Sequence, residues 1–405
     1  MFKMLFIKRN AILITIFILA LAIRFIFVLK SHDIPASDAW VYDRLGLSIA
    51  EGRGYTDSDG TPHSLYPPFY PLVLSVIYRV CGHNYTAVRL AQSILGALTC
   101  VMIYVLGRKI FYEMVGLIAA VFLGVYLPFI KSSCMLLSEL LLTFLLVAVI
   151  LVLVSLKGAR GKIRFALCIS AGLLLSAAFL TKSIMFLFPF VAAVIIFLGD
   201  GLRNLFAWRK VCIIALFFCV AIAPWIARNY MLYNAFLPVS PEGGLVLYSS
   251  YRPARGIFGL IADPQDPVVK EGGAIHSPIM RRDFFVKKTV EFVIRNPKDT
   301  IILEMKKILY FWAPYDWEIV GNRWFNVLFV AVLPFFVYGF KLILKLKTGW
   351  PILAPIVYFQ IMTLLFYGSP RFRLPIDPFI FLVSAVGMIS CGRLVFFESR
   401  RKIAS

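Results

Sequence analysis

Acidic and metal-binding side chains are scarce in this chain. Its 405 residues include 21 Asp and Glu against 42 Lys and Arg, with only four His and seven Cys. The histidines are not clustered and the cysteines show no metal-ligand spacing, so a zinc site is not expected. A Walker phosphate loop and a GxSxG nucleophile elbow are also absent, which leaves nucleotide hydrolysis and serine-based catalysis without their usual motifs.

Apolar sequence, in contrast, dominates the chain. Hydrophobic residues make up 60% and charged residues 16% of it, a composition typical of polytopic membrane proteins rather than soluble domains. A transmembrane helix needs about 20 mainly apolar residues. Ten runs are predicted to span the bilayer: 11–29, 86–107, 113–130, 136–156, 164–181, 183–199, 211–227, 325–345, 350–367 and 372–393.

Two further apolar stretches, 67–82 and 300–313, are too short or too charged to cross a bilayer. We expect them to lie at the membrane surface as interfacial helices. The predicted fold class is therefore an all-α integral membrane protein with about ten transmembrane helices and interfacial helices on the outer face.

The basic residues of the short loops orient the chain. Cytoplasmic loops of membrane proteins carry an excess of Lys and Arg. A cytoplasmic N-terminus places a large group of basic residues on that side, with few acidic ones: Lys3, Lys8, Arg9, Arg108, Lys109, Lys157, Arg160, Lys162, Arg164, Arg203, Arg209, Lys210, Lys341, Lys345, Lys347, Arg393, Arg400, Arg401 and Lys402. The formal net charge of +21 is mostly this signature, so no nucleic-acid partner is needed to explain it. We expect a multi-pass plasma-membrane (bacterial inner-membrane) protein with both termini in the cytoplasm.

Three regions follow from this topology. Residues 1–227 form an N-terminal transmembrane core with a first outer loop at 30–85, and residues 325–405 form the C-terminal transmembrane helices and a basic cytoplasmic tail. The region 228–324 between them is rich in Gly and Pro and includes a charged helix at 281–296. It is too short for a domain of usual size and too long for a bare connector. We therefore predict that it covers an outer cavity as a lid.

The first outer loop holds a polar, mostly acidic stretch at 31–71, directly after the first span. Ser37 is a plausible N-cap of a helix that Gly52 or Gly54 ends, with Asp38 in its first turn. One face of this helix is expected to lie along the membrane interface, with Trp40, Val41, Leu45, Ser48 and Ile49 on it.

Several segments, in order, resemble one enzyme family. They are SDAWVYDRLGLSIAEGRGY, PHSLYPPFYPLVLSVIYRVCG, VRLAQSILGALT, LSELLLTFLL, AAFLTKS, PWIARNY and RFRLP. Their succession is similar to the polyprenyl-phosphate-dependent GT-C glycosyltransferases, in particular the bacterial branch related to protein mannosyltransferases and aminoarabinose lipid A transferases. The resemblance covers most of the chain and is weakest in 230–320.

The resemblance implies an inverting transfer of a sugar from a polyprenyl-phosphate donor to a hydroxyl of an envelope glycan, lipid or protein. Such an enzyme, a hexosyl- or pentosyltransferase, would act at the outer, periplasmic face of the membrane. A transporter or flippase of lipid-linked sugars is the alternative, since it would also need spans, buried cations and a cavity. Discontinuous spans in corresponding halves would favour that alternative, and the sequence shows none.

Asp38 matches the catalytic aspartate of the family in its first outer loop. An inverting transfer needs one ionised carboxylate to take the acceptor proton, and a helix N-terminus favours the ionised form. The alternative is that Asp38 only caps its helix.

Glu139 is the second candidate catalytic carboxylate. It lies at the outer end of a long apolar span, where an ionisable group is costly unless it is used or paired. In the resembling family an acidic residue near this place supports the base or positions the acceptor. The alternative is a non-catalytic ion pair with Lys131 or Lys182.

Four cations at predicted outer ends of spans are candidates for binding the donor phosphate: Lys182, Arg228, Arg371 and Arg373. Each could instead anchor the chain to lipid headgroups. Weaker candidates for substrate binding are Asp43, Tyr42, His63, Tyr66 and Arg89, although Asp43 is also expected to form a surface ion pair with Arg44 or a neighbour. No cofactor is predicted. Asp38, Asp43 and Glu139 offer oxygen ligands for a divalent cation, but no ligand spacing predicts such a site.

Overall fold

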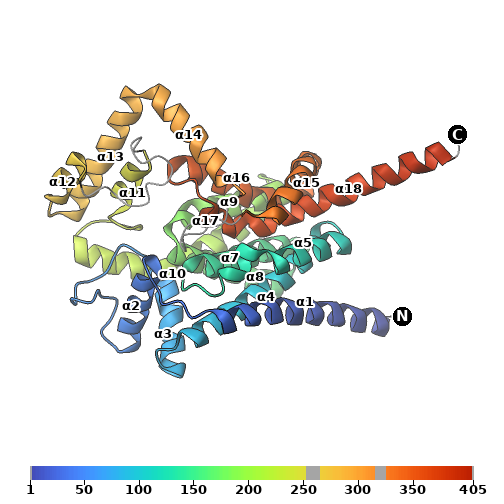
Figure 1. Cartoon of the computed structure of the whole chain (residues 1–405), viewed down its shortest axis with the longest axis horizontal. Coiled ribbons are helices and arrows are strands. Elements are labelled where there is room, and N and C mark those ends of the chain that lie inside the picture. The colour runs from blue at the N-terminus through green and yellow to red at the C-terminus, as the bar shows by residue number, and fades with distance from the viewer. Residues whose placement is uncertain (1, 252–264, 315–324, 404–405) are drawn as a thin grey trace.

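The computed structural model describes residues 2–251, 265–314 and 325–403, and within these ranges the regular structure is helical. Its long helices form one bundle with the N- and C-termini at the same end (Figure 1). The shorter helices α2, α3, α11, α12 and α13 gather at the opposite end. The all-α fold predicted from the sequence is confirmed.

The helices of the first half, in chain order, are α1 (Phe2–Lys30), α2 (Asp38–Ala50), α3 (Phe69–Cys81), α4 (Tyr85–Ile110), α5 (Glu113–Val125), α6 (Leu127–Lys131), α7 (Ser138–Ser155), α8 (Gly161–Thr181), η1 (Ser183–Leu187), α9 (Phe188–Asp200) and α10 (Leu205–Tyr233). Those of the second half are α11 (Gly243–Ser250), α12 (Pro267–Gly273), α13 (Pro278–Arg295), α14 (Pro297–Phe311), α15 (Val327–Leu344), η4 (Lys347–Gly349), α16 (Trp350–Leu365), α17 (Pro370–Arg373), η5 (Leu374–Ile376) and α18 (Asp377–Ile403).

Eight of the ten predicted spans coincide with segments long and apolar enough to cross a membrane: Asn10–Lys30, Tyr85–Ile110, Ser138–Ser155, Gly161–Thr181, Ser183–Asp200, Leu205–Tyr233, Val327–Leu344 and Pro370–Gly392. The predicted spans 113–130 and 350–367 coincide with the shorter apolar helices α5 and α16. α5 is short because Tyr126 takes an extended conformation and the chain restarts as α6. The chain is thus a multi-pass membrane protein, but a count of ten spans is not confirmed.

The core of the bundle is built around α7 and α18. Of the eight candidate spans, these two are the most buried, whereas most of α1 faces outwards. α18 packs against α15 and α5, and α7 packs against α4 and α8. Gly339 on α15 and Gly387 on α18 allow the first of these contacts, since a Cβ at Gly339 would lie 2.1 Å from the Val383 carbonyl oxygen and one at Gly387 would lie 2.0 Å from that of Phe335. Small residues permit such close helix crossings in membranes.

The predicted helix of the first outer loop forms as α2, but the side on which it packs against protein was not predicted. Ala39, Tyr42, Asp43 and Gly46 are buried at helical spacing, while Trp40 is 46% exposed. α2 packs against α3, so the side that carries Gly46, where a Cβ would lie 2.7 Å from the Leu74 Cβ, faces protein. Ser37 occupies the N-cap position at φ 54° but makes no capping hydrogen bond with its side chain.

The predicted charged helix at 281–296 and the predicted interfacial helices at 67–82 and 300–313 appear as α13, α3 and α14. The Gly- and Pro-rich stretch 252–264, which the sequence assigns to a lid, lies outside the described residues.

Candidate active site

A cavity of about 880 Å³ lies at the end of the bundle that carries α2 and α11. Its walls come from segments far apart in the chain: the loop into α2, the segment before α3, the turn before α7, the turn between α8 and α9, the segment that begins α11, and the end of α16 with α17. Most of the lining side chains are apolar. The charged ones are Asp33, Asp38, Arg89, Lys182 and Arg371. An apolar pocket with a few converging polar groups is the usual form of a ligand site.

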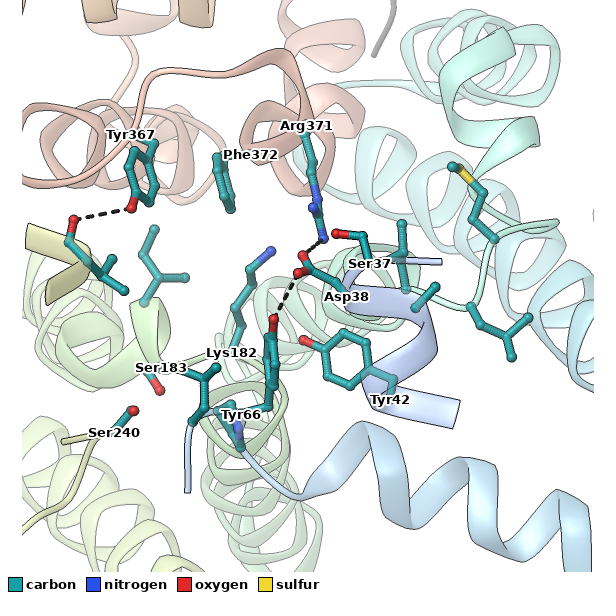
Figure 2. A pocket seen from close by; sticks show the side chains of 18 of the residues that line it. Ser37, Asp38, Tyr42, Tyr66, Lys182, Ser183, Ser240, Tyr367, Arg371 and Phe372 are labelled. Atoms are coloured by element: carbon teal, nitrogen blue, oxygen red, sulfur yellow. Dashed lines mark hydrogen bonds and ion pairs between the residues drawn. The ribbon is translucent and has the colours of Figure 1, made fainter. Parts of the chain in front are cut away.

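Asp38 begins α2 and points into this cavity (Figure 2). Its Oδ1 accepts a hydrogen bond of 2.8 Å from the Tyr66 hydroxyl, and its Oδ2 lies 2.8 Å from a terminal guanidinium nitrogen of Arg371. The side chain remains 31% exposed. Both contacts fix the orientation of the carboxylate, while its exposed part stays reachable from the cavity.

Arg371 bridges two carboxylates. Its Nε lies 2.6 Å from Oε1 of Glu139, while its terminal nitrogen contacts Asp38. The same Glu139 oxygen accepts a hydrogen bond of 2.7 Å from Nζ of Lys182. Glu139 is fully buried and does not line the cavity, whereas Lys182 and Arg371 both do. Glu139 therefore pairs with both cations from inside the protein and not from the cavity.

The order of charges is Asp38, Arg371, Glu139, Lys182, with each neighbour of opposite sign. Burial lowers the pKa of Lys182, and the charge of Glu139 acts in the opposite direction. A buried charge is tolerated when it is paired and hydrogen-bonded in this way. Of the two alternatives for Glu139 as an ion-pair partner, Lys131 and Lys182, the structure shows Lys182.

Local structure explains how Arg371 reaches the cavity. The side chain of Ser369 accepts a hydrogen bond from the Arg371 backbone nitrogen and caps the short helix α17. Phe372 lies beside Arg371 on the cavity wall, and Nζ of Lys182 lies 4.6 Å from the centre of the Phe372 ring. A cation above an aromatic face is stabilised by the ring, so Phe372 helps to place the Lys182 ammonium.

Two tyrosines border the carboxylates. Tyr66 donates to Asp38, and the Tyr42 hydroxyl lies 3.2 Å from that of Ser138. Burial raises the pKa of Tyr66, as does the neighbouring Asp38. Burial also raises the pKa of Tyr42, with Glu139 as the next cause. Both phenols therefore keep their protons at neutral pH, and Tyr66 donates its proton to the hydrogen bond with Asp38.

Arg373, two residues from Arg371, does not line the cavity. Its Nε lies 3.0 Å from Oδ1 of Asp377, and another nitrogen donates to the carbonyl oxygens of Phe311 and Ala313 at 2.9 and 3.1 Å. The guanidinium also lies 3.6 Å above the Phe329 ring. Arg373 thus joins α14, α15 and α18 inside the protein.

Arg228 and His63 also lie outside the cavity lining. Arg228, on α10, donates to the carbonyl oxygens of Tyr55 and His63 at 3.2 and 2.8 Å. It therefore attaches the first outer loop to α10. His63 is 6% exposed and contacts Asp57 and the backbone of Tyr66.

Asp43 faces the interior between α2, α3 and the start of α4 rather than the surface. It accepts hydrogen bonds from Tyr78 at 2.6 Å and Tyr85 at 3.0 Å, and its Oδ1 lies 2.8 Å from Nε2 of His83. Asp43 was expected to pair at the surface with Arg44 or a neighbour. The neighbour His83 contacts it, but Asp43 sits on the buried side of α2, and the guanidinium of Arg44 lies 5.4 Å from the centre of the Trp40 ring instead.

Arg89 does line the cavity, but its guanidinium is engaged with the backbone. It donates to the carbonyl oxygens of Cys134 at 3.0 Å and Ser31 at 2.7 Å, and also to that of Asp33. Arg89 thereby ties the loop before α2 to the turn before α7, so that Asp38 and Glu139 are brought close together.

The three carboxylates that could serve a divalent cation do not share a site. Asp38 and Glu139 are separated by Arg371, and Asp43 points elsewhere. In the part of the chain that the structure describes, no group of three or more His, Cys, Asp or Glu side chains could hold a metal ion.

Three contributors to the site were not singled out from the sequence: Phe372, Ser138 and Tyr367. Phe372 and Tyr367 line the cavity, and Tyr367 donates a 3.2 Å hydrogen bond to the carbonyl oxygen of Val246 on α11. The signal for Phe372 was its place between the two arginines of RFRLP. Nothing in the sequence pairs Ser138 with Tyr42, 96 residues away.

Comparison with known proteins agrees with this architecture. Residues 66–227, less than half of the chain, match the family model described as dolichyl-phosphate-mannose-protein mannosyltransferase. The archaeal oligosaccharyltransferase AglB from Archaeoglobus fulgidus, solved with an inhibitory peptide and a dolichol-phosphate, superposes with a TM-score of 0.59 at 14% identity. The match covers 98% of this chain and 52% of that one, so this chain spans about half the length of AglB.

ArnT from Cupriavidus metallidurans, solved with undecaprenyl phosphate, aligns at a TM-score of 0.49 and 14% identity over 94% of this chain and 78% of that one. No curated protein sequence matches. The comparisons show that this chain shares the fold of AglB and that part of it matches a mannosyltransferase family model. Both findings agree with the resemblance to polyprenyl-phosphate-dependent GT-C glycosyltransferases that the sequence motifs carry.

Proposed function

We propose that the protein is an inverting glycosyltransferase. It moves a hexose or pentose from a polyprenyl-phosphate donor to a hydroxyl of an envelope glycan, lipid or protein. The observation that carries the proposal is the placement of one reachable carboxylate, Asp38, beside two cations, Arg371 and Lys182, on the wall of one apolar cavity. The family match and the GT-C fold support the same reaction class.

In the proposed reaction Asp38 is the base. It takes the proton of the acceptor hydroxyl as the acceptor oxygen forms a bond to the anomeric carbon of the sugar. The bond from that carbon to the phosphate oxygen breaks, and its electron pair leaves with the polyprenyl phosphate. A base on one face of the sugar and a leaving group on the other invert the anomeric centre, and the phosphate needs no strong acid to depart.

Arg371 and Lys182 stabilise the departing phosphate. Both line the cavity, and both are held by the buried Glu139. Arginine presents a planar fork that suits phosphate oxygens, and lysine acts as a point charge. Electrostatic groups fixed in advance stabilise developing charge without reorganising during the reaction. Glu139 therefore acts as a positioning residue and does not itself touch the substrate.

Arg371 also couples the two halves of the reaction. One terminal nitrogen lies against Asp38, and this nitrogen is on the cavity side. A donor phosphate that binds Arg371 competes with Asp38 for that contact.

The active site is proposed to face the periplasmic or outer side of the plasma membrane. The basic loops predicted to be cytoplasmic support this orientation, as does the position of both termini at the end of the bundle opposite to α2 and α11 (Figure 1). The segment that includes Val239, Ser240, Gly243 and Val246 borders the cavity, which supports the role of the region 228–324 as a cover that helps to select the acceptor.

The test is transfer by purified protein. Radiolabelled polyprenyl-phosphate sugars are incubated with an envelope extract, and labelled acceptor is measured for the wild type and for Asp38→Asn. The proposal expects transfer by the wild type, loss of transfer by the variant, and retained donor binding in both. Full activity of Asp38→Asn would refute the assigned base. Movement of lipid-linked sugar across vesicles without transfer would instead indicate the flippase alternative.

A further inference from the structure

A histidine outside the cavity lies against Tyr66, the residue that holds the proposed base. The Tyr66 backbone nitrogen donates to Nε2 of His63 at 3.1 Å, and the two rings are stacked with an interplanar angle of 2°. The other ring nitrogen, Nδ1, lies 2.9 Å from Oδ1 of Asp57. His63 is 6% exposed, so its ring nitrogens have little access to water as an alternative hydrogen-bond partner.

These contacts assign one protonation state to His63. A backbone N–H can only donate, so Nε2 must accept and carries no proton. The proton of the neutral ring then sits on Nδ1 and is donated to Asp57. A second proton on Nε2 would place two N–H groups against each other and leave the buried Tyr66 N–H without its acceptor.

The segment around His63 is attached to the rest of the protein at several points. Arg228 donates to the carbonyl oxygens of Tyr55 and His63, and Ser64 hydrogen-bonds to Tyr233 of α10. The Tyr55 hydroxyl donates to the Tyr66 carbonyl oxygen at 2.8 Å. The backbone of Tyr66 is therefore held on both sides, by His63 at its nitrogen and by Tyr55 at its oxygen.

Building on the proposed function, we infer that neutral His63 is a positioning residue for the base. It fixes the Tyr66 backbone, and the Tyr66 hydroxyl in turn fixes Asp38 through the 2.8 Å hydrogen bond to Oδ1. His63 thus acts from outside the cavity, and the sequence-based expectation that it binds substrate is replaced by this role. Protonation of His63 would release Tyr66 and loosen the base.

The groups that face His63 determine the pH at which this happens. They are Asp57 and Tyr55 from its own loop, Tyr66 after it and Arg228 from α10. Burial lowers the pKa of His63, Asp57 opposes this, and Arg228 adds to it. Because the pKa of the folded protein lies below the ordinary value of about 6.5, the neutral form is stable at neutral pH. The arrangement is lost as the pH falls through this lowered pKa.

The first test measures amide hydrogen exchange in the peptide that contains Tyr66, in full-length protein without substrate. His63→Phe removes the acceptor, and His63→Gln supplies a side-chain oxygen that accepts from the Tyr66 N–H but does not titrate. His276→Gln, at an exposed histidine far along the chain, is the matched control. At pH 7 we expect about tenfold faster exchange in His63→Phe only, the factor expected for one lost buried hydrogen bond.

The exchange is then followed from pH 7 downward to the lowest pH at which the protein stays folded. Below the lowered pKa of His63 the wild type and His276→Gln should exchange faster than His63→Gln after correction for the intrinsic rate. Equal exchange in all four proteins over the whole range would overturn the inference. Wild-type exchange that follows His63→Gln over the whole range would overturn its pH-dependent part.

The second test measures transfer and separates this inference from the proposed function. His63→Phe should lower kcat while leaving the KM for donor unchanged, and His63→Gln should lose the fall in activity that the wild type shows as the pH drops below the pKa of His63. If Asp38→Asn abolishes transfer but these variants behave as wild type, the inference fails and the function stands. If no transfer occurs while exchange changes as expected, the positioning of Tyr66 stands and the function fails.

Discussion

In two pairs of like residues that are close in sequence, the two members of each pair have different environments. Asp38 and Asp43 lie five residues apart on α2, and Arg371 and Arg373 lie two apart at α17. Asp38 and Arg371 meet on the cavity wall, whereas Asp43 and Arg373 are enclosed by protein groups. The comparison teaches that the direction of a side chain from its helix, rather than its residue type or motif, separates a candidate reactive group from a structural one.

The base on the cavity wall should show the largest effect. Asp38→Asn keeps the shape and the hydrogen bond from Tyr66 but cannot take a proton, so turnover should fall by about 10²–10⁴-fold, the usual range for a lost general base. Transfer of radiolabelled sugar by the purified variant measures this. The donor's binding constant serves as the control and should change little. A fall in turnover of less than about threefold would place Asp38 with Asp43 as a structural residue.

Arg373→Met should mainly affect stability. The change leaves Asp377 buried without its guanidinium partner, and removal of one member of a buried pair typically costs about 3–5 kcal/mol. Thermal unfolding in detergent measures the loss, and Arg373→Met combined with Asp377→Leu should recover part of it. If the folded fraction of the single variant showed a large rise in the KM for donor, Arg373 would belong to the phosphate site after all.

Lys182→Met should weaken donor binding. It removes one cation from the cavity wall and one hydrogen bond from Glu139, and a hydrogen bond to a charged group contributes about 1.5–3 kcal/mol. We expect the donor concentration for half-maximal transfer to rise about tenfold or more. Lys182→Arg, which keeps the charge, is the control and should retain most of the affinity. If Lys182→Met and Lys182→Arg changed this donor concentration equally, the result would argue against a contact between Lys182 and the donor phosphate.

Asp43→Asn should have the smallest effect on catalysis. Asp43 accepts from two tyrosines and contacts His83, and an amide can keep only part of these bonds, so the protein should lose about 1–3 kcal/mol of stability. Turnover of the folded protein should stay within about threefold of the wild type, since Asp43 does not line the cavity. A loss of turnover comparable to that of Asp38→Asn would remove the distinction between the two aspartates.

Much of the fold was predictable because it rests on local properties of the sequence. The long apolar runs predicted eight of the helices that could cross a membrane, and the amphipathic and turn patterns predicted α2, α3, α13 and α14. The side on which α2 packs against protein was not predicted. Its sequence offers apolar residues on more than one side, and contact with α3 selects the side with Tyr42 and Gly46.

The candidate site was predictable as a set of residues but not as an arrangement. The sequence and its family resemblance pointed to Asp38, Glu139, Lys182 and Arg371, and these four form one chain of ion pairs. Arg228 and His63 were singled out with them, yet they hold the first outer loop instead of lining the cavity. Charge and membrane position are visible in sequence, whereas the partner of each charge is not.

By itself the sequence determined the helical class, the membrane-spanning runs and the scarcity of carboxylates that made Asp38 and Glu139 conspicuous. Only the tertiary structure decided that Arg371 bridges those two carboxylates, that Arg373 does not join them, and that His63 lies against Tyr66. The reason is physical. Helix formation and membrane insertion depend on neighbours within a few turns, but an ion pair between residues 232 or 333 positions apart forms only where the packed bundle brings their helices together.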